Sequence, residues 1–416
     1  MSKVVLRMTE LLPEIDRTRL LDLASELVRI PSFVPNESDA AFYLRDFFTD
    51  RGYDVLMQEV ESGRFQTIAT LPGAGSGRSL MFNGHLDINS LMIGGTRDPW
   101  TPTVEGDRLY GHGIQNMKGG VATMIEAAES IRLAGIELQG DLVLACVVGE
   151  TQGGVGTNYL MESGFRTDAA ILTEPFGLGK IVTVHGGIMH FAIHTHGLSA
   201  HISRAQDTVN AVVQMTKVVE ALQHVEFTYV PREDLPALPL INVGSIIGGR
   251  GQGYVLTEPP YIPDLCTIIV DVHHAPGQTA ETVEADIRKV LDALAAEDTD
   301  FKYEFEMPPP EFFRGRRELV MEPVDIPVDE PIVLSVAQNH EHVTGKAPDV
   351  IGAALPMSYS AGDTCWLWGA GIPSLHYGPA GGFEETGPEG AYISVTEMVT
   401  IAEVLALTAM DFCGTS

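Results

Sequence analysis

The first 180 residues alternate between short β-rich runs and longer runs with helical spacing, and this alternation restricts the fold more than any other feature. Apolar residues keep the spacing of one helix face at positions 20, 21, 24, 27 and 28, and further helical runs cover 40–52 and 119–135. Strand-like runs occupy 53–60, 66–71, 79–87, 141–148 and 168–175. The pattern predicts an α/β sheet with helices on its faces.

Acidic and histidine side chains stand where several of these predicted strands end. His85 and Asp87 close one run, and Glu150 and Glu174 stand at the ends of two later runs. Ligands gather at the carboxyl ends of strands in open α/β sheets, so we expect these side chains to share one site. An Asp two residues after a His can accept the second ring N–H of a metal-binding imidazole. Taken singly, Glu150 also fits a solvated strand end, and Glu174 a turn or helix cap.

Composition limits the classes of partner. The chain has 416 residues, of which 44% are hydrophobic and 20% charged, as expected of a two-domain globular protein. A net charge of −30 opposes binding to nucleic acid or to an anionic membrane, which favours small-molecule partners. We find neither an apolar run of about 18 to 20 residues nor a signal-like N-terminus, and the four cysteines form no CxxC pair. We therefore expect a cytoplasmic protein without a thiolate metal site.

Seven motifs follow one another along the chain: GHLD, YGHGIQNMKGG, VVGETQGG, LTEP, GLSAHIS, DVHHAPG and GIPSLHYGPAGG. In this order they resemble the metallopeptidase and deacylase family of carboxypeptidase G, acetylornithine deacetylase and succinyl-diaminopimelate desuccinylase, over nearly the whole chain. The resemblance implies a zinc-exopeptidase-like mixed sheet flanked by helices, with an inserted α+β lid and dimerisation domain. One fold hosts many chemistries, so the resemblance leaves the reaction open.

The expected domains are a catalytic one formed by 1–186 plus 309–416 and a lid formed by 187–308. The lid segment has strand-like and helical runs in the order β-α-β-β-α-β, which is the split βαβ layout. Residues 308–318 are expected to be a linker. The resemblance implies that the lid dimerises through its sheet edge, so the protein is expected to be a homo-oligomer.

The resemblance also implies a metal site. The family holds two ions about 3.5 Å apart, an arrangement suited to hydrolysis. The first ion would bind His85, Asn116 at the bridging position and Glu174. The second set is broken here, because the bridge is Asn116 instead of Asp and the second Glu of a Glu-Glu pair is Thr151. The late His of the family falls near Glu385 or Thr386.

A neutral Asn is a poor bridge between two dications, because its single carbonyl oxygen carries no net charge. Thr151 is a weak ligand as well. We therefore expect one divalent transition metal per subunit, manganese or zinc, bound by His85 and Glu174 and by Asn116 directly or through water. Its affinity should be modest, and positions should stay open for water and substrate.

The resemblance assigns further roles. Glu150 matches the family's general acid/base, Asp87 orients His85, and His201 in GLSAHIS matches a lid histidine that reaches a partner subunit's site and stabilises negative charge. Other polar residues could bind a substrate carboxylate or remain ordinary surface and capping residues. These candidates are Thr151, Arg204, Arg250, Arg314, Arg316, Arg317, His112, His185, His190, His273, His274 and His376.

Loss of the second metal removes oxyanion stabilisation, for which a single donor is worth about 3 to 4 kcal/mol. The site then favours an acceptor that stores charge elsewhere, such as an electron-poor aromatic ring. The departures resemble the aminohydrolase branch that converts 5-nitroanthranilate to 5-nitrosalicylate and ammonia, and this is the predicted function. The alternative is an amidohydrolase or exopeptidase acting on N-acyl amino acids or small peptides. A third possibility is an inactive ligand-binding homologue, against which the retained His85, Asp87, Glu150 and His201 argue.

Overall fold

The computed structural model describes residues 15–91, 93–309, 319–383 and 388–415. The chain forms two compact units. The first contains the chain up to Val184, Asp325–Ala354 and the chain from Gly362, and the second contains His185–Val324 and Leu355–Ala361. The boundaries expected from the sequence, 186/187 and 308/309, compare with 184/185 and 324/325 in the structure. Most of the expected linker lies outside the described residues.

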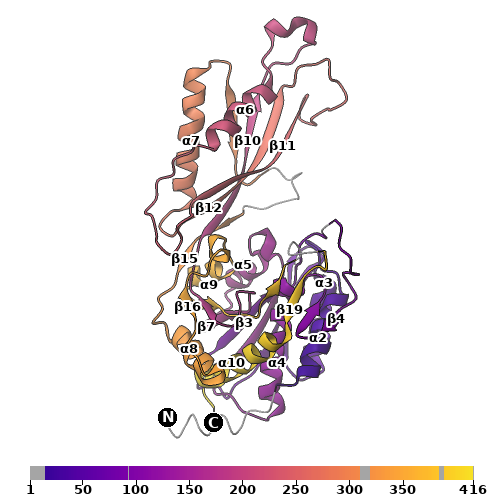
Figure 1. The fold of residues 1–416 in the computed structure, drawn as a ribbon, viewed down its shortest axis with the longest axis vertical. Coiled ribbons are helices and arrows are strands. Elements are labelled where there is room, and N and C mark those ends of the chain that lie inside the picture. Colours follow the sequence, from indigo (N-terminus) through magenta and orange to yellow (C-terminus); the bar gives the residue numbers. More distant parts are fainter. Residues whose placement is uncertain (1–14, 92, 310–318, 384–387, 416) are drawn as a thin grey trace. The chain divides into compact units, whose positions relative to one another are not determined.

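A mixed sheet forms the centre of the first unit (Figure 1). Its eight strands have the order β1-β2-β6-β3-β7-β17-β8-β16. Strands β6, β3, β7 and β17 run parallel to one another, whereas β2 is antiparallel to β6 and β8 to β17. The strands are β1 (Asp54–Glu61), β2 (Arg64–Leu71), β3 (Leu80–His85), β6 (Leu142–Val147), β7 (Ala169–Leu172), β8 (Lys180–Val182), β16 (Val350–Gly352) and β17 (Ser374–His376).

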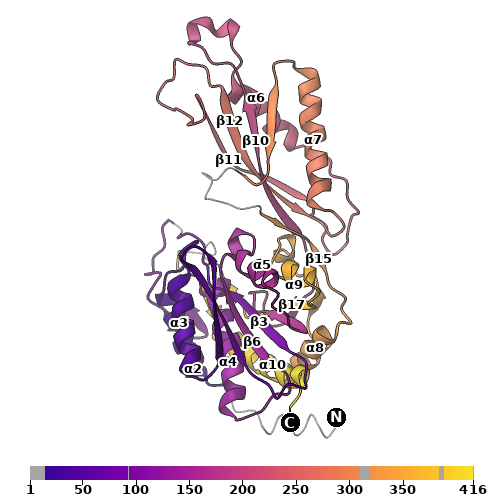
Figure 2. The ribbon, with the colours of Figure 1, turned by 180° about the vertical axis from the view of Figure 1, so that it is seen from behind.

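Alternate residues of the central strands enter separate cores on the two faces of this sheet, as the two-residue period of a strand requires. Phe82 and Leu144 pack in the larger core, and Met81 and Val143 pack in the smaller one. Helices α2 (Arg17–Arg29), α3 (Ser38–Thr49), α4 (Gly119–Leu133), α8 (Pro331–Thr344) and α10 (Val395–Cys413) contribute to the larger core. Helices α5 (Val155–Glu162) and α9 (Thr364–Gly369) cover the other face. Helix α3 packs on β1 and β2 (Figure 2).

Short elements complete the first unit, and two further ones, β9 and β15, contain the residue pairs 184/185 and 324/325 at which the chain passes between the units. A four-stranded sheet has the order β18-β19-β5-β4, and β15 pairs with β9. The bounds are β4 (Thr103–Glu105), β5 (Arg108–Tyr110), β9 (Val184–His185), β15 (Val324–Asp325), β18 (Gly381–Gly382), β19 (Tyr392–Ser394), η1 (Ile114–Lys118) and η2 (Glu150–Gln152). All four cysteines lie in the described part of the chain, where they are buried and form no disulfide bond. Within the described residues, no helix is both long and apolar enough to cross a membrane.

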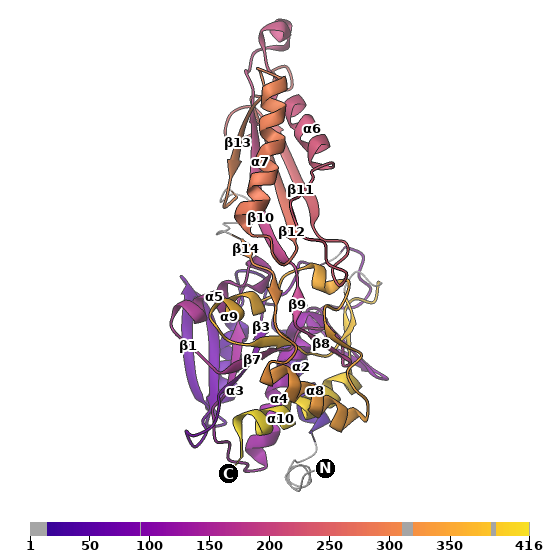
Figure 3. The ribbon, with the colours of Figure 1, turned by 90° about the vertical axis from the view of Figure 1, so that its left-hand side faces the viewer.

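The second unit is an antiparallel sheet in the order β11-β12-β10-β13, with β14 added to β10. Helices α6 and α7 pack against each other and against these strands (Figure 3). The chain order β10-α6-β11-β12-α7-β13 is the β-α-β-β-α-β order expected from the sequence. The elements are β10 (Gly187–His196), η3 (Ile202–Asp207), α6 (Ala211–Leu222), β11 (Leu240–Gly249), β12 (Leu265–His274), α7 (Ala280–Glu297), β13 (Lys302–Glu306), β14 (Val320–Met321) and η4 (Met357–Tyr359). The predicted fold class is confirmed.

Candidate active site

The carboxyl ends of four neighbouring parallel strands meet in the first unit and carry the predicted polar residues. His85 is the last residue of β3, Glu150 follows β6, Glu174 follows β7 and His376 ends β17. Asn116 lies in η1, between β5 and α4. The parallel pairing of β3 with both β6 and β7 brings residues far apart in sequence to one edge of the sheet.

The His85 imidazole is surrounded by oxygen atoms. Its Nδ1 lies 2.9 Å from the backbone oxygen of Asp87 and 3.4 Å from the Asp87 carboxylate. Its Nε2 lies 2.9 Å from Oδ1 of Asn116 and 3.6 Å from Oε1 of Glu174. A neutral imidazole has only one N–H, and here Nδ1 donates it to Asp87. Nε2 nevertheless faces two acceptor oxygens, so it must either carry a second proton or bind a metal ion.

These separations fit a shared metal ion. Two ligands about 2.1 Å from one ion and roughly a right angle to a tetrahedral angle apart lie about 3.0 to 3.4 Å from each other. The Nε2 distances to Asn116 and Glu174 fall close to that range. The contact of Nδ1 with Asp87 leaves Nε2 as the ring nitrogen available to a metal ion, because a metal-binding imidazole usually donates its other N–H to a carboxylate or carbonyl oxygen.

Only one of the three candidate metal ligands, Glu174, is a carboxylate. Within the residues that the structure describes, no group of three or more His, Cys, Asp or Glu side chains is arranged to hold a metal. Of the described side chains near Nε2 of His85, Glu174 is the one further donor of those types, and the third donor is the amide oxygen of Asn116. Glu385 and Thr386, where the family's late histidine was aligned, lie outside the described residues.

Thr151 holds Asp87 in place. Its hydroxyl donates to Oδ2 of Asp87 at 2.8 Å and its backbone N–H donates to the same oxygen at 3.0 Å. The backbone N–H of Glu150 donates to the other carboxylate oxygen at 3.1 Å. Burial opposes a charge on Asp87, yet His85 and the Thr151 donors lower the pKa of this carboxyl overall. The Thr151 hydroxyl is thus engaged with Asp87.

Glu150 has the electrostatic character of a proton-transfer group. Burial raises its pKa well above the usual value, and although the charge of His85 lowers it, the carboxylates of Glu174, Asp363 and Asp87 raise it further. A raised carboxyl pKa in a cluster of this kind is typical of general acids and bases. Burial likewise raises the pKa of Glu174.

Asp363 belongs to the same electrostatic cluster, although it was not among the site residues expected from the sequence. Its side chain is buried directly before α9, and its Oδ2 accepts a hydrogen bond of 2.6 Å from the Thr157 hydroxyl. Thr157 in turn accepts a 3.0 Å hydrogen bond from Asn83 of β3. Burial raises the pKa of Asp363 to about 7, against the lowering effects of Thr157 and His85. The segment SAGDTCW carries no motif that would have indicated this role.

A buried ion pair supports the turn that carries Glu150. The guanidinium of Arg64 forms a bidentate ion pair with the Glu37 carboxylate through two hydrogen bonds, and both side chains are almost fully buried. The same guanidinium donates to the side-chain oxygen of Gln152 at 2.8 Å. Trp366 of α9 donates to the backbone oxygen of Gly153 at 2.9 Å on the other side of the turn. These contacts fix the backbone around Glu150.

Other predicted residues lie apart from these contacts. His376 is buried, with Nε2 3.1 Å from the Thr364 hydroxyl and its ring against Phe176. His201, Arg204 and Arg250 are in the second unit. His201 contacts Ser203, and both His201 and Arg250 contact the ring of Tyr261. Arg250 also pairs with Glu258, and Arg204 with Asp207, and the predicted Arg314, Arg316 and Arg317 lie outside the described residues.

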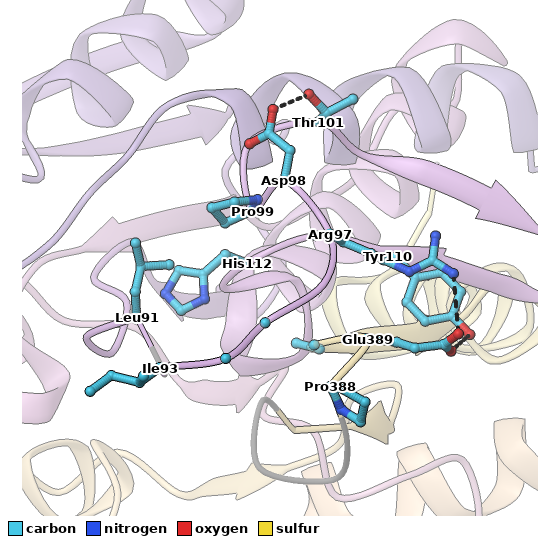
Figure 4. A pocket seen from close by; sticks show the side chains of 15 residues that line it. Leu91, Ile93, Arg97, Asp98, Pro99, Thr101, Tyr110, His112, Pro388 and Glu389 are labelled. Carbon is cyan, nitrogen blue, oxygen red and sulfur yellow. Dashed lines mark hydrogen bonds and ion pairs between the residues drawn. The ribbon is translucent and has the colours of Figure 1, made fainter.

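A cleft of about 480 Å³ opens in the first unit, beside segments that lead into the site. His112, Leu91 and Ile93 lie on one side of it, and Tyr110 and Glu389 on the other (Figure 4). Leu91 and Ile93 belong to the segment that follows Asp87 in the chain. His112 lies four residues before Asn116.

Comparisons with known proteins agree with this architecture. The model of peptidase family M20/M25/M40 matches residues 81–411. An N-formyl-4-amino-5-aminomethyl-2-methylpyrimidine deformylase from Halalkalibacterium halodurans is 28% identical over 438 residues, covering 97% of each chain. An M20 family metallo-carboxypeptidase from Sulfolobus solfataricus superposes with a TM-score of 0.73 at 16% identity, covering 95% of this chain and 99% of the other. A dinuclear metal-binding M20 peptidase from Bacillus subtilis gives 0.65 at 15% identity, covering 95% and 98%.

Proposed function

Because this chain belongs to peptidase family M20/M25/M40, we propose that it is an amidohydrolase that removes a small acyl group, such as formyl, from the amine of a small molecule. Family membership makes the chain a hydrolase, and the wider class of metal-dependent C–N bond hydrolysis fits its relatives. The observation that carries the proposal is the convergence of His85 Nε2 with the side-chain oxygens of Asn116 and Glu174, in one electrostatic cluster with Glu150.

His85, Glu174 and Asn116 would hold one divalent ion, with manganese and zinc as the candidates. When bound, such an ion polarises the scissile carbonyl and acidifies a water molecule. Glu150 accepts the proton of the attacking water and returns it to the leaving nitrogen, a cycle that a carboxyl of raised pKa can complete near neutral pH. Asp87 keeps His85 oriented through both of its oxygen contacts.

The deformylase relative supports amide hydrolysis. It is 28% identical over 97% of both chains, and its name describes removal of a formyl group from an aminomethylpyrimidine. A formyl group is the smallest acyl group and makes the least demand on space at the site. We therefore place N-formyl amines first and N-acyl amino acids or small peptides next among the substrates.

Aromatic deamination of 5-nitroanthranilate, the function predicted first from the sequence, becomes the second candidate because the curated relative is an amide hydrolase. Asn116 and Thr151 stand where the family has carboxylates, and a site with less cationic charge favours an acceptor whose ring takes up the negative charge. Among the described contacts of the His85 cluster, no lysine or arginine side chain stands ready for a substrate carboxylate, which favours N-formyl amines without a carboxylate over both 5-nitroanthranilate and N-acyl amino acids.

A direct assay decides between the two. Purified protein is stripped of metal, resupplied with manganese or zinc, and offered N-formyl-4-amino-5-aminomethyl-2-methylpyrimidine, N-acetyl amino acids and 5-nitroanthranilate. Metal-dependent release of formate is the expected outcome. Release of ammonia from 5-nitroanthranilate without formate release would instead establish the aromatic reaction, and turnover of neither would contradict both. Metal analysis of the same preparations tests for one ion per subunit.

Pairing between copies of the second unit is the assembly we propose. Strand β11 is an edge strand of that sheet, and its Leu240 and Ile246 are 43% and 55% exposed. Open edges of this kind pair readily with another strand. In such a dimer His201 would serve the active site of the other copy. Sedimentation of the wild type and of an Ile246→Lys variant tests the dimer, which the lysine should weaken.

A further inference from the structure

Lys118 is a buried lysine at the end of the segment that carries Asn116. It is the last residue of η1, and its side chain is among the largest fully buried ones of the described chain. Its Nζ donates hydrogen bonds to the backbone oxygens of Leu27 at 2.8 Å and Ile30 at 2.6 Å. Burying an ammonium group is unfavourable unless its N–H groups find acceptors, and here the two carbonyl oxygens provide them.

The two acceptors belong to the end of helix α2. Leu27 lies in the last turn of α2, Ile30 is its C-cap residue, and Pro31 disfavours a further helical turn. The last carbonyl groups of a helix lack partners in a following turn and carry partial negative charge, so a cation is favoured at this end. Lys118 therefore fastens the segment that carries Asn116 to the end of α2.

The chain that follows α2 is also fastened to the segment that follows β3. The Ser32 side chain is fully buried, and its hydroxyl donates to the backbone oxygen of Leu86 at 2.6 Å. The backbone oxygen of Ser32 accepts a hydrogen bond of 3.2 Å from the N–H of Ile88, and Phe33 forms a parallel bridge with Ile88. Residues 27–33 thus contact both of the segments that supply the imidazole and the amide of the proposed metal site.

Direct contacts between these two segments leave little space between them. A Cβ atom on Gly113, whose φ is 73°, would lie 2.3 Å from Cγ2 of Ile88. The Met117 sulfur lies 3.2 Å from the backbone nitrogen of His85. In an interior packed this closely, the position of Asn116 relative to His85 depends on the contacts that hold each segment.

We propose that Lys118 is a positioning residue for the metal site. It holds the Asn116 segment on the end of α2, and Ser32 holds the His85 segment on the same stretch of chain. Together these contacts fix the 2.9 Å separation between Oδ1 of Asn116 and Nε2 of His85. The proposal rests on the proposed function only in that the cluster binds a divalent ion. Lys118 acts through the backbone and takes no part in the chemical step.

The sign of the change in metal affinity identifies positioning. Lys118→Met removes both hydrogen bonds and a positive charge, and it keeps an unbranched side chain. Loss of a positive charge by itself raises the affinity for a dication, because like charges repel. A fall in affinity therefore comes from a misplaced ligand. Ligands held in the bound geometry bind more tightly than ligands that binding has to order, so the manganese dissociation constant should rise about tenfold.

Competition with a chelating dye measures the manganese affinity, and circular dichroism of the metal-free protein checks the fold. The matched control is Arg19→Met, because Arg19 of α2 forms an ion pair with Glu126 of α4 and joins the same two helices by a different contact. This control should lose stability and keep its manganese affinity within about twofold. In the Asn116→Ala background Lys118→Met should no longer lower the affinity, because the ligand that Lys118 positions is absent.

The outcomes separate positioning from the reaction. An unchanged or higher manganese affinity of folded Lys118→Met overturns the proposal, and so does an equal fall in the Asn116→Ala background. If Lys118→Met does not fold, Ser32→Ala tests the same arrangement from the His85 segment. It should raise the dissociation constant about threefold, and an unchanged value overturns the proposal. The expected changes in manganese affinity without formate release by the wild type would keep the positioning role and contradict the proposed reaction.

Discussion

The side-chain oxygen of Asn116 lies 2.9 Å from Nε2 of His85, so a neutral amide oxygen faces the imidazole nitrogen that we propose binds the metal. Replacing Asn116 by Asp should raise manganese affinity at least about tenfold, because a charged ligand replaces a neutral one beside the same imidazole. Competition with a chelating dye measures this. Asn242→Asp in the second unit serves as the control, and unchanged affinity in Asn116→Asp would show that residue 116 is no ligand.

Glu150→Gln should lower turnover by about 10² to 10⁴-fold, because the amide cannot accept the proton of the attacking water. Metal content should stay unchanged, since Glu150 is outside the proposed ligand set. Steady-state kinetics and metal analysis of the same preparation check both statements. The exposed Glu162→Gln is the matched control. Full activity of Glu150→Gln would remove this residue from the mechanism.

Asp363→Asn should stabilise the metal-free protein but weaken its affinity for metal. The carboxyl groups of Asp87, Glu150, Glu174 and Asp363 interact electrostatically around a single imidazole, so neutralising Asp363 relieves repulsion when no cation is bound. The metal-free variant should therefore melt at a higher temperature than the wild type. Its metal affinity should fall about tenfold, because one negative charge is removed from the surroundings of the proposed ion.

Calorimetry with and without metal measures both effects in Asp363→Asn. A variant that is destabilised in both states would identify the hydrogen bond from Thr157 as the main contribution of Asp363. Thr157→Val is the companion variant, because it removes that hydrogen bond and leaves the carboxyl in place.

Arg64→Met should lower the free energy of unfolding by about 3 to 5 kcal/mol, because it leaves the buried Glu37 without its partner. Turnover should fall as well, since Gln152 loses its contact and the Glu150 turn loosens. Urea unfolding and kinetics check these effects. In the double variant Arg64→Met with Glu37→Met most of the stability should return, and turnover should stay low. Recovery of both would mean that Arg64 does not position the turn.

Stability should depend on pH through His185, which is buried and whose pKa burial lowers to about 4. The unfolded chain binds a proton near pH 6.5 and the folded chain does not, so this contribution is complete above pH 6.5 and declines as the pH falls toward 4. Between pH 6.5 and 5 the loss should be about 2 kcal/mol. Calorimetric unfolding of the wild type and of His185→Gln at both pH values measures it. An equal pH dependence in the two proteins would contradict the assignment.

Local periodicity accounts for what the sequence alone determined. The runs at 79–87, 141–148 and 168–175 became β3, β6 and β7, and the alternation of helix and strand made their carboxyl ends meet. His85, Glu150 and Glu174 could therefore be assigned to one edge of the sheet from the positions of these runs. The β-α-β-β-α-β order of the second unit followed from the same kind of pattern.

Contacts between distant segments were decided only by the tertiary structure. Asp363 reaches the cluster through Thr157 and Asn83, and Arg64 reaches the Glu150 turn through Gln152, yet no spacing in the sequence marks either residue. The resemblance aligned Thr151 with a metal-binding position, but its hydroxyl donates a hydrogen bond to Asp87. Sequence pattern records which face of an element is apolar, a property of neighbouring residues. The partner of a buried polar group depends on how whole elements pack, and that information is spread over the entire chain.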